Sequence, residues 1–98
     1  MSKPCTIIVI FEAKAGKEDE LASALRAVVE PSRSEDICLE YKLHQSDDNP
    51  AQFVMYEQWV SKDKLQEHFD KPYIIELRKK FETLLAKPSQ MIFATELI

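Results

Sequence analysis

The spacing of apolar side chains changes several times along the chain, and each change marks a predicted element. Residues 5–13 are apolar at nearly consecutive positions and rich in β-branched side chains, which predicts a strand covered on both faces. Gly16 suits the turn that follows, and Pro31 is expected to end or kink the next helix. That helix is predicted from residue 17 to about residue 29, because apolar side chains recur with a helical period at Leu21, Leu25, Val28 and Val29.

A hairpin is predicted in the middle of the chain. Residues 37–45 alternate between apolar and polar side chains, which is typical of a strand with one wetter face. Residues 46–50 are a cluster of turn-forming side chains, and residues 52–60 form the next strand-like run. We therefore expect the two strands to pair in antiparallel orientation.

A broken helix is predicted next. Ser61 is expected to cap its first part, which places Leu65, His68 and Phe69 on one apolar face. Pro72 can start the second part, and Pro88 closes it. The second part has its own apolar face, made of Tyr73, Leu77, Phe81, Leu84 and Leu85.

Residues 90–98 are predicted to form the last strand, which gives the order β-α-β-β-α-β. This is the ferredoxin-like arrangement of an α+β fold, with an antiparallel sheet in a single domain over residues 1–98. Helices on one side leave the other face of such a sheet open. The first and last strands are apolar on both faces, so we expect a homodimer whose two sheets stack or close into a shared α/β barrel.

Composition and charge exclude several classes of protein. The net charge of -4 argues against nucleic acid or an anionic membrane surface as partner. No apolar run approaches the ~18 residues of a membrane span, and the N-terminus lacks the organisation of a signal peptide. Cys5 and Cys38 stand alone, without metal-ligand spacing, so each is expected to be a small buried apolar side chain in a reducing cytoplasm.

Candidate chemistry concentrates in Tyr56-Glu57-Gln58-Trp59 and in His68 nine residues later. This stretch holds the only Trp and one of only two His residues of the chain. Strand alternation places Glu57 and Trp59 on one face with Phe53 and Met55, and places Tyr56 on the opposite face. A carboxylate among such neighbours must be paired, hydrogen-bonded or protonated.

The same block resembles the antibiotic biosynthesis monooxygenase family of dimeric α/β barrels. The residues that carry the resemblance are Tyr56-Glu57-x-Trp59-x-Ser61, then Leu65-x-x-His68, then Pro72-Tyr73. Small quinol monooxygenases and the autoinducer-2 phosphate isomerase are the most similar branches. One departure is Ser34-Glu35-Asp36-Ile37-Cys38, which stands where members often carry a Pro-Gly turn.

Haem-degrading relatives differ from this chain at the residues that matter for that activity. They use an Asn, a Trp and a His where this chain aligns Ile8, His68 and Arg78. A haem-degrading activity is therefore not carried over.

The resemblance implies oxidation of a small aromatic, phenol- or quinol-type substrate by oxygen, without metal, flavin or haem. His68 would be the acid/base group, because its unperturbed pKa lies near neutrality, and Glu57 would orient it or polarise the substrate. The candidate substrate-binding residues are Trp59, Tyr73, Tyr41, Arg78 and Met55. Each also has a structural alternative: a hydrogen-bonded His68, a Glu57 bonded across the dimer, packed aromatic rings, and an Arg78 paired with Glu82.

Two other functions remain open at this stage. An isomerase of a small phosphorylated carbonyl compound would use His68 to shuttle a proton and Arg78 to hold the anion. A dimer that binds a small ligand without catalysis is the third hypothesis, because sites and not folds define function.

Overall fold

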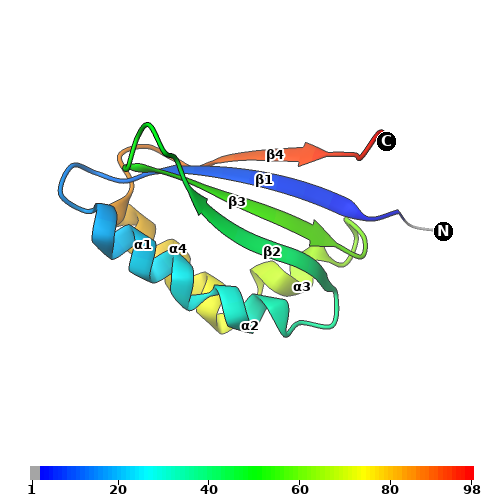
Figure 1. The fold of residues 1–98 in the computed structure, drawn as a ribbon. Coiled ribbons are helices and arrows are strands. Elements are labelled where there is room, and N and C mark those ends of the chain that lie inside the picture. Colours follow the sequence, from blue (N-terminus) through cyan, green and yellow to red (C-terminus); the bar gives the residue numbers. More distant parts are fainter. Residues whose placement is uncertain (1–2) are drawn as a thin grey trace.

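The chain folds into a four-stranded antiparallel sheet with helices on one face (Figure 1). The structure, a computed structural model, describes residues 3–98, so the first two residues of the predicted N-terminal segment lie outside it. The strands lie in the order β2-β3-β1-β4. The elements are β1 (Cys5–Glu12), α1 (Glu18–Ala27), α2 (Val29–Arg33), β2 (Cys38–Gln45), β3 (Gln52–Trp59), α3 (Leu65–Phe69), α4 (Pro72–Leu84) and β4 (Gln90–Ala94). The predicted α+β ferredoxin-like class is confirmed.

The first predicted helix is divided in two, and Pro31 explains where. In a continuous helix the ring of a proline clashes with the carbonyl four residues earlier, which here belongs to Ala27. Ala27 is the last residue of α1, and the chain resumes helical hydrogen bonding in α2 after Val28. Pro31 then lies in the first turn of α2, where its missing N–H forfeits no intrahelical bond.

Two predicted boundaries are wrong. Strand β4 ends at Ala94 and not at residue 98, because Ala94 pairs with Thr6 and β1 begins only one residue before Thr6. Leu97 and Ile98 are therefore exposed beyond the sheet. Ser61 does not cap α3, whose N-cap is Lys64. The Ser61 hydroxyl instead accepts a hydrogen bond of 3.3 Å from the backbone N–H of Lys64 and closes the turn before the helix.

The core lies between the sheet and the helices. Strand β3 alternates regularly, with its odd-numbered residues, Phe53 to Trp59, buried under the helices. Ile7, Val9 and Phe11 of β1 share that face, since the register pairs Ile7 with Glu57. The prediction that Glu57 and Trp59 share the covered face, with Tyr56 opposite, is confirmed. This alternation brings a carboxylate into the layer that also receives His68.

The opposite side of the sheet, called here the open face, has no covering element among the described residues. Its apolar side chains are Ile8, Ile10, Val54, Tyr56 and Ile92, which the register places beside one another. All five are only partly buried or exposed. The sheet of a single chain is not closed into a barrel.

The lone cysteines flank Trp59. Cys5 of β1 and Cys38 of β2 both pair in register with Trp59 of β3, so two strand spacings separate them. That separation is too large for a disulfide. Cys5 is buried as predicted, and Cys38 is partly buried. Burial raises the pKa of both thiols, that of Cys38 to about 11, so neither is a ready nucleophile at neutral pH.

Residues 3–98 contain neither a membrane-spanning helix nor a cluster of metal-ligating side chains. None of their helices is both long and apolar enough to cross a membrane. Nor does that part of the chain bring together three or more His, Cys, Asp or Glu side chains able to hold a metal ion.

The turn at Gly16 should be a measurable determinant of stability. Gly16 has φ +84, and a Cβ added there would meet nothing within 4 Å. Gly16→Ala should therefore lower the free energy of unfolding by about 1 kcal/mol through backbone strain alone. Gly16→Asn should lose less, because Asn tolerates this conformation better. Urea unfolding of both variants tests the difference, and an unchanged Gly16→Ala midpoint would show that the turn accepts a negative φ.

Candidate functional site

A small, mostly apolar pocket lies between the sheet and helices α3 and α4. Its volume is about 80 Å³. A carboxyl, an imidazole and a guanidinium reach its wall from three elements: Glu57 from β3, His68 from α3 and Arg78 from α4. The remaining lining residues are Val9, Phe11, Tyr41, Phe69, Ile74, Leu77, Phe81, Ser89 and Met91.

Glu57 is a buried carboxyl whose only hydrogen bond within the described chain comes from its neighbour on the same strand face. The indole Nε1 of Trp59 donates to Glu57 Oε1 at 2.9 Å, and Glu57 is 5% exposed. Burial raises the pKa of Glu57 to about 7, against the lowering effect of the Trp59 bond and with a further rise from the charge of Glu35. Glu57 can therefore give or take a proton near neutral pH.

His68 lies at the back of the pocket and is 2% exposed. Its ring lies against Trp59, with 4.3 Å between ring centroids and a tilt of 41° between the planes, and meets Tyr41 edge-on at 5.7 Å. Burial lowers the pKa of His68, while the hydrogen bond and charge of Glu35 oppose that fall. Since the shift is downward from 6.5, the His68 imidazole is predominantly neutral at pH 7.

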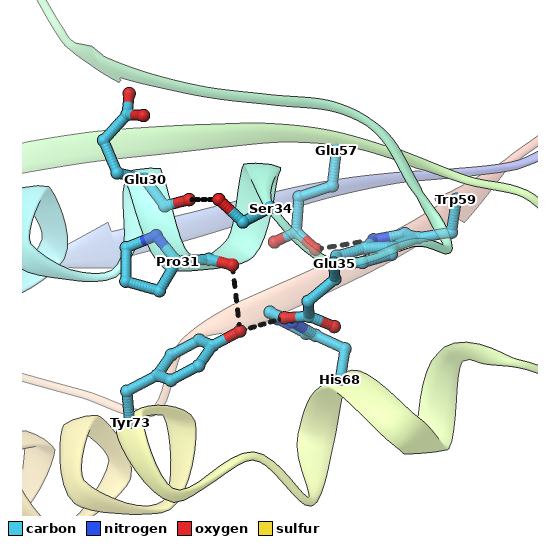
Figure 2. A network of polar contacts seen from close by, with 8 residues as sticks. All are labelled: Glu30, Pro31, Ser34, Glu35, Glu57, Trp59, His68 and Tyr73. Atoms are coloured by element: carbon cyan, nitrogen blue, oxygen red, sulfur yellow. Dashed lines mark hydrogen bonds and ion pairs between the residues drawn. The ribbon is translucent and has the colours of Figure 1, made fainter.

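The hydrogen-bond partner of His68 is Glu35, a residue that the sequence did not single out. His68 Nδ1 lies 2.7 Å from Glu35 Oε2, and the Tyr73 hydroxyl donates to the same oxygen. Figure 2 shows the Glu35 side chain reaching from the end of α2 toward Tyr73 on α4 and His68 on α3. The Glu35 side chain is only 5% exposed. Its polar neighbours Ser34 and Asp36 are typical of a solvated loop, so the local pattern carried no signal of this burial.

The structure distributes the other predicted site residues between the pocket wall and the layer behind it. Tyr41 and Arg78 line the pocket, as Glu57 and His68 do. Trp59 and Met55 are fully buried and do not line the pocket, and Tyr73 is partly buried and hydrogen-bonded to Glu35. Burial raises the pKa of the Tyr41 phenol, so it remains protonated at neutral pH. The functional roles of these residues stay predictions.

Arg78 contacts Phe69 and not Glu82, the partner that helical i+4 spacing suggested. Its guanidinium lies 4.9 Å above the ring of Phe69. Glu82, four residues further along α4, is not among the ion-pair partners found in residues 3–98. Arg78 is exposed, so its charge lies at the mouth of the pocket and remains available to an anionic group. His44, the other histidine, is exposed on β2.

A larger but shallower depression, of about 420 Å³, lies between α1 and α4. Its lining is Glu20, Ser23, Ala24, Ala27, Lys80, Thr83 and Leu84. Its charged members are exposed side chains, so it lacks the desolvated titratable groups that distinguish the smaller pocket.

Comparison with known proteins identifies the family. A model of the antibiotic biosynthesis monooxygenase family matches residues 4–80, which is most of the chain. The chain therefore belongs to this family, and the resemblance first indicated by the block from Tyr56 to Tyr73 is confirmed.

Similar individual proteins come from several bacteria. An uncharacterized protein of Synechocystis, sll1783, is 31% identical over 88 residues, which are 90% of this chain but only 60% of that protein's length. Rv0793 of Mycobacterium tuberculosis, named as a candidate monooxygenase, is 31% identical over 90% of this chain and 86% of its own. The crystal structure of PA3566 from Pseudomonas aeruginosa has a TM-score of 0.94 and 34% identity, covering 100% of this chain and 98% of that one.

Removing the charge of Glu57 should change how stability depends on pH. The folded-state pKa of Glu57 is raised from 4.5 to about 7, so between these values the folded state holds a proton that the unfolded state has lost. The contribution of Glu57 therefore falls as pH rises through this window. Glu57→Gln should remove that fall and stabilise the protein at pH 8 by on the order of 1 to 3 kcal/mol relative to pH 4.5.

Urea unfolding at a series of pH values measures this effect as the difference between wild-type and variant curves. Taking the difference cancels the opposite trend from His68, whose lowered pKa costs stability as pH falls. The exposed Glu82→Gln variant is the matched control and should run parallel to wild type. Parallel curves for Glu57→Gln would instead show that Glu57 ionises without penalty.

Proposed function

We propose that the protein is a cofactor-independent monooxygenase that oxidises a small phenol or quinol. The observation that supports it most is that His68, neutral at pH 7, and Glu57, with a pKa of about 7, reach the wall of one apolar pocket. A pair of desolvated groups with oppositely shifted pKa values is suited to acid–base work. Membership of the family and similarity to Rv0793 point in the same direction.

The proposed reaction needs an electron-rich anion. Ground-state oxygen reacts slowly with closed-shell molecules, but a phenolate can transfer one electron to it and then combine with the resulting superoxide. A dihydroxybenzene and one O₂ then give a hydroxyquinone and one water, so the substrate itself supplies the two electrons that reduce the second oxygen atom. The protein has to take a proton from the phenol and return one to the departing oxygen.

In this proposal His68 takes the phenol proton and Glu57, in its protonated form, donates to the departing oxygen. Arg78 at the mouth attracts a substrate with an anionic substituent, and the apolar lining excludes water from the anion. The pocket, at about 80 Å³, is far below the ~300 Å³ at which ligand sites usually begin. Entry of an aromatic ring therefore requires lining side chains to move, and Met91, which is 40% exposed, is the apolar lining residue with the most access to solvent.

Oxygen uptake by purified protein, with a panel of quinols and hydroxybenzenes, tests the reaction. His68→Ala should lower the rate by about 10²- to 10⁴-fold, the usual contribution of a general base. His44→Ala is the matched control, because it removes the exposed histidine and should leave the rate unchanged. A panel on which wild type and His68→Ala consume oxygen equally would contradict the proposal.

An anaerobic arm separates the proposal from its two rivals. Turnover of a phosphorylated carbonyl compound without oxygen would identify an isomerase instead. Saturable binding of a quinol without turnover in either atmosphere would identify a binding protein.

We further propose that two chains pair through the open face, since the apolar side chains gathered there have no covering element in one chain. Ile8→Glu places a charge at its centre and should convert a dimer into a monomer. Ile75→Glu, on the helical side and 44% exposed, is the control and should stay dimeric. Sedimentation equilibrium measures both, and a wild-type mass of one chain at micromolar concentration would contradict the pairing.

A further inference from the structure

We propose that Glu35 is a positioning residue for His68. Its carboxylate keeps the ring hydrogen of His68 on Nδ1, so that Nε2 is the unprotonated nitrogen, and it stabilises the positive charge that the ring acquires when Nε2 takes a proton. This inference deepens the proposed function, because it specifies how His68 is prepared to act as a base.

Hydrogen-bond chemistry at Glu35 Oε2 determines the direction of the bond. Glu35 Oε2 already accepts the Tyr73 hydroxyl, and the oxygens of an ionised carboxylate can only accept, so with Glu35 ionised the His68 nitrogen at 2.7 Å donates. A neutral imidazole carries one ring hydrogen, which this bond assigns to Nδ1. Nε2 is then left with a lone pair, the form that a general base requires.

Glu35 is held firmly enough to orient a partner. Its backbone N–H donates to Ser32 at 3.1 Å, and its carbonyl accepts from Cys38 at 3.0 Å. The Tyr73 hydroxyl donates to Glu35 Oε2 and also lies 3.2 Å from the carbonyl of Pro31. Tyr73 has a single hydroxyl hydrogen, so it donates to one of these two acceptors at a time, and the Pro31 carbonyl is the alternative to Glu35 Oε2.

The arrangement at Glu35 is costly if its role is only structural. Glu35 Oε1 is buried, and no hydrogen-bond partner for it is found in residues 3–98. A buried carboxyl oxygen without a protein partner costs stability, so its retention at this position calls for a reason. The geometry gives such a reason, because the same carboxyl is bonded to His68, which lines the pocket.

Other groups around His68 do not substitute for Glu35. Tyr41 of β2 and Trp59 of β3 contact its ring through their aromatic faces or edges. Arg78 and Lys71 are positive and disfavour an imidazolium. Glu57 is bonded to Trp59 Nε1 and is not bonded to His68. Glu57→Gln is therefore a matched control, because it replaces a second buried carboxyl in the same layer without removing a bond to His68.

Nitrogen-15 NMR of the imidazole rings tests the tautomer directly. His44→Gln removes the only other histidine, so every remaining ring signal belongs to His68. Above its titration midpoint, His68 should show a protonated Nδ1 and an unprotonated Nε2. The opposite tautomer in this background would overturn the proposal, and this readout requires no variant of Glu35.

The charge effect is tested by following the same signals with pH. Glu35→Gln should lower the titration midpoint of His68 by about one pH unit or more, because an adjacent negative charge is lost. Glu57→Gln should move it much less, and Tyr73→Phe should keep the Nδ1–H form. Equal midpoints in Glu35→Gln and Glu57→Gln would overturn the electrostatic role. Because no substrate is needed, these results stand whether or not oxygen uptake is observed.

Discussion

Exclusion of water from the layer between β3 and helices α3 and α4 determines the properties of the candidate site. The strand pleat points Glu57 into that layer beside an aromatic ring, and the helix turns His68 into it from the other side. Without water, a carboxyl resists ionisation and an imidazole resists protonation. Two ordinary side chains thereby come to titrate on opposite sides of their usual ranges, and the same fold that hides them provides the apolar pocket they face.

Patterns along the sequence predicted the parts of this layer that depend on local periodicity. Alternation in residues 52–60 separated Glu57 and Trp59 from Tyr56, and the helical period after Ser61 placed His68 inward. These successes share a cause, because each periodicity follows from backbone geometry within one element. Glu35 lies outside any periodic element and meets His68 across 33 residues. No pattern of neighbours encodes such a contact, which arises only when α2, α3 and α4 are packed together.

The end of the last strand was predicted wrongly for a related reason. The apolar run after Pro88 looks like a strand to its last residue, yet β4 stops at Ala94, one residue short of the start of β1. Pairing, and not composition, sets the length of an edge strand. The break before α2 shows the converse, since one proline fixes it through a local clash. The break matters for the site, because the short helix that follows leads directly into the loop that delivers Glu35.

Trp59 makes the candidate site observable by fluorescence. It is the only indole of the chain, fully buried, and its ring lies against His68 while its N–H is held by Glu57. The emission of an indole responds to the protonation state of an imidazole in contact with it and to the charge of a carboxyl bonded to its N–H. The intrinsic fluorescence of the protein is therefore a label-free report, from a single position, on the two titrating groups that touch this ring, His68 and Glu57.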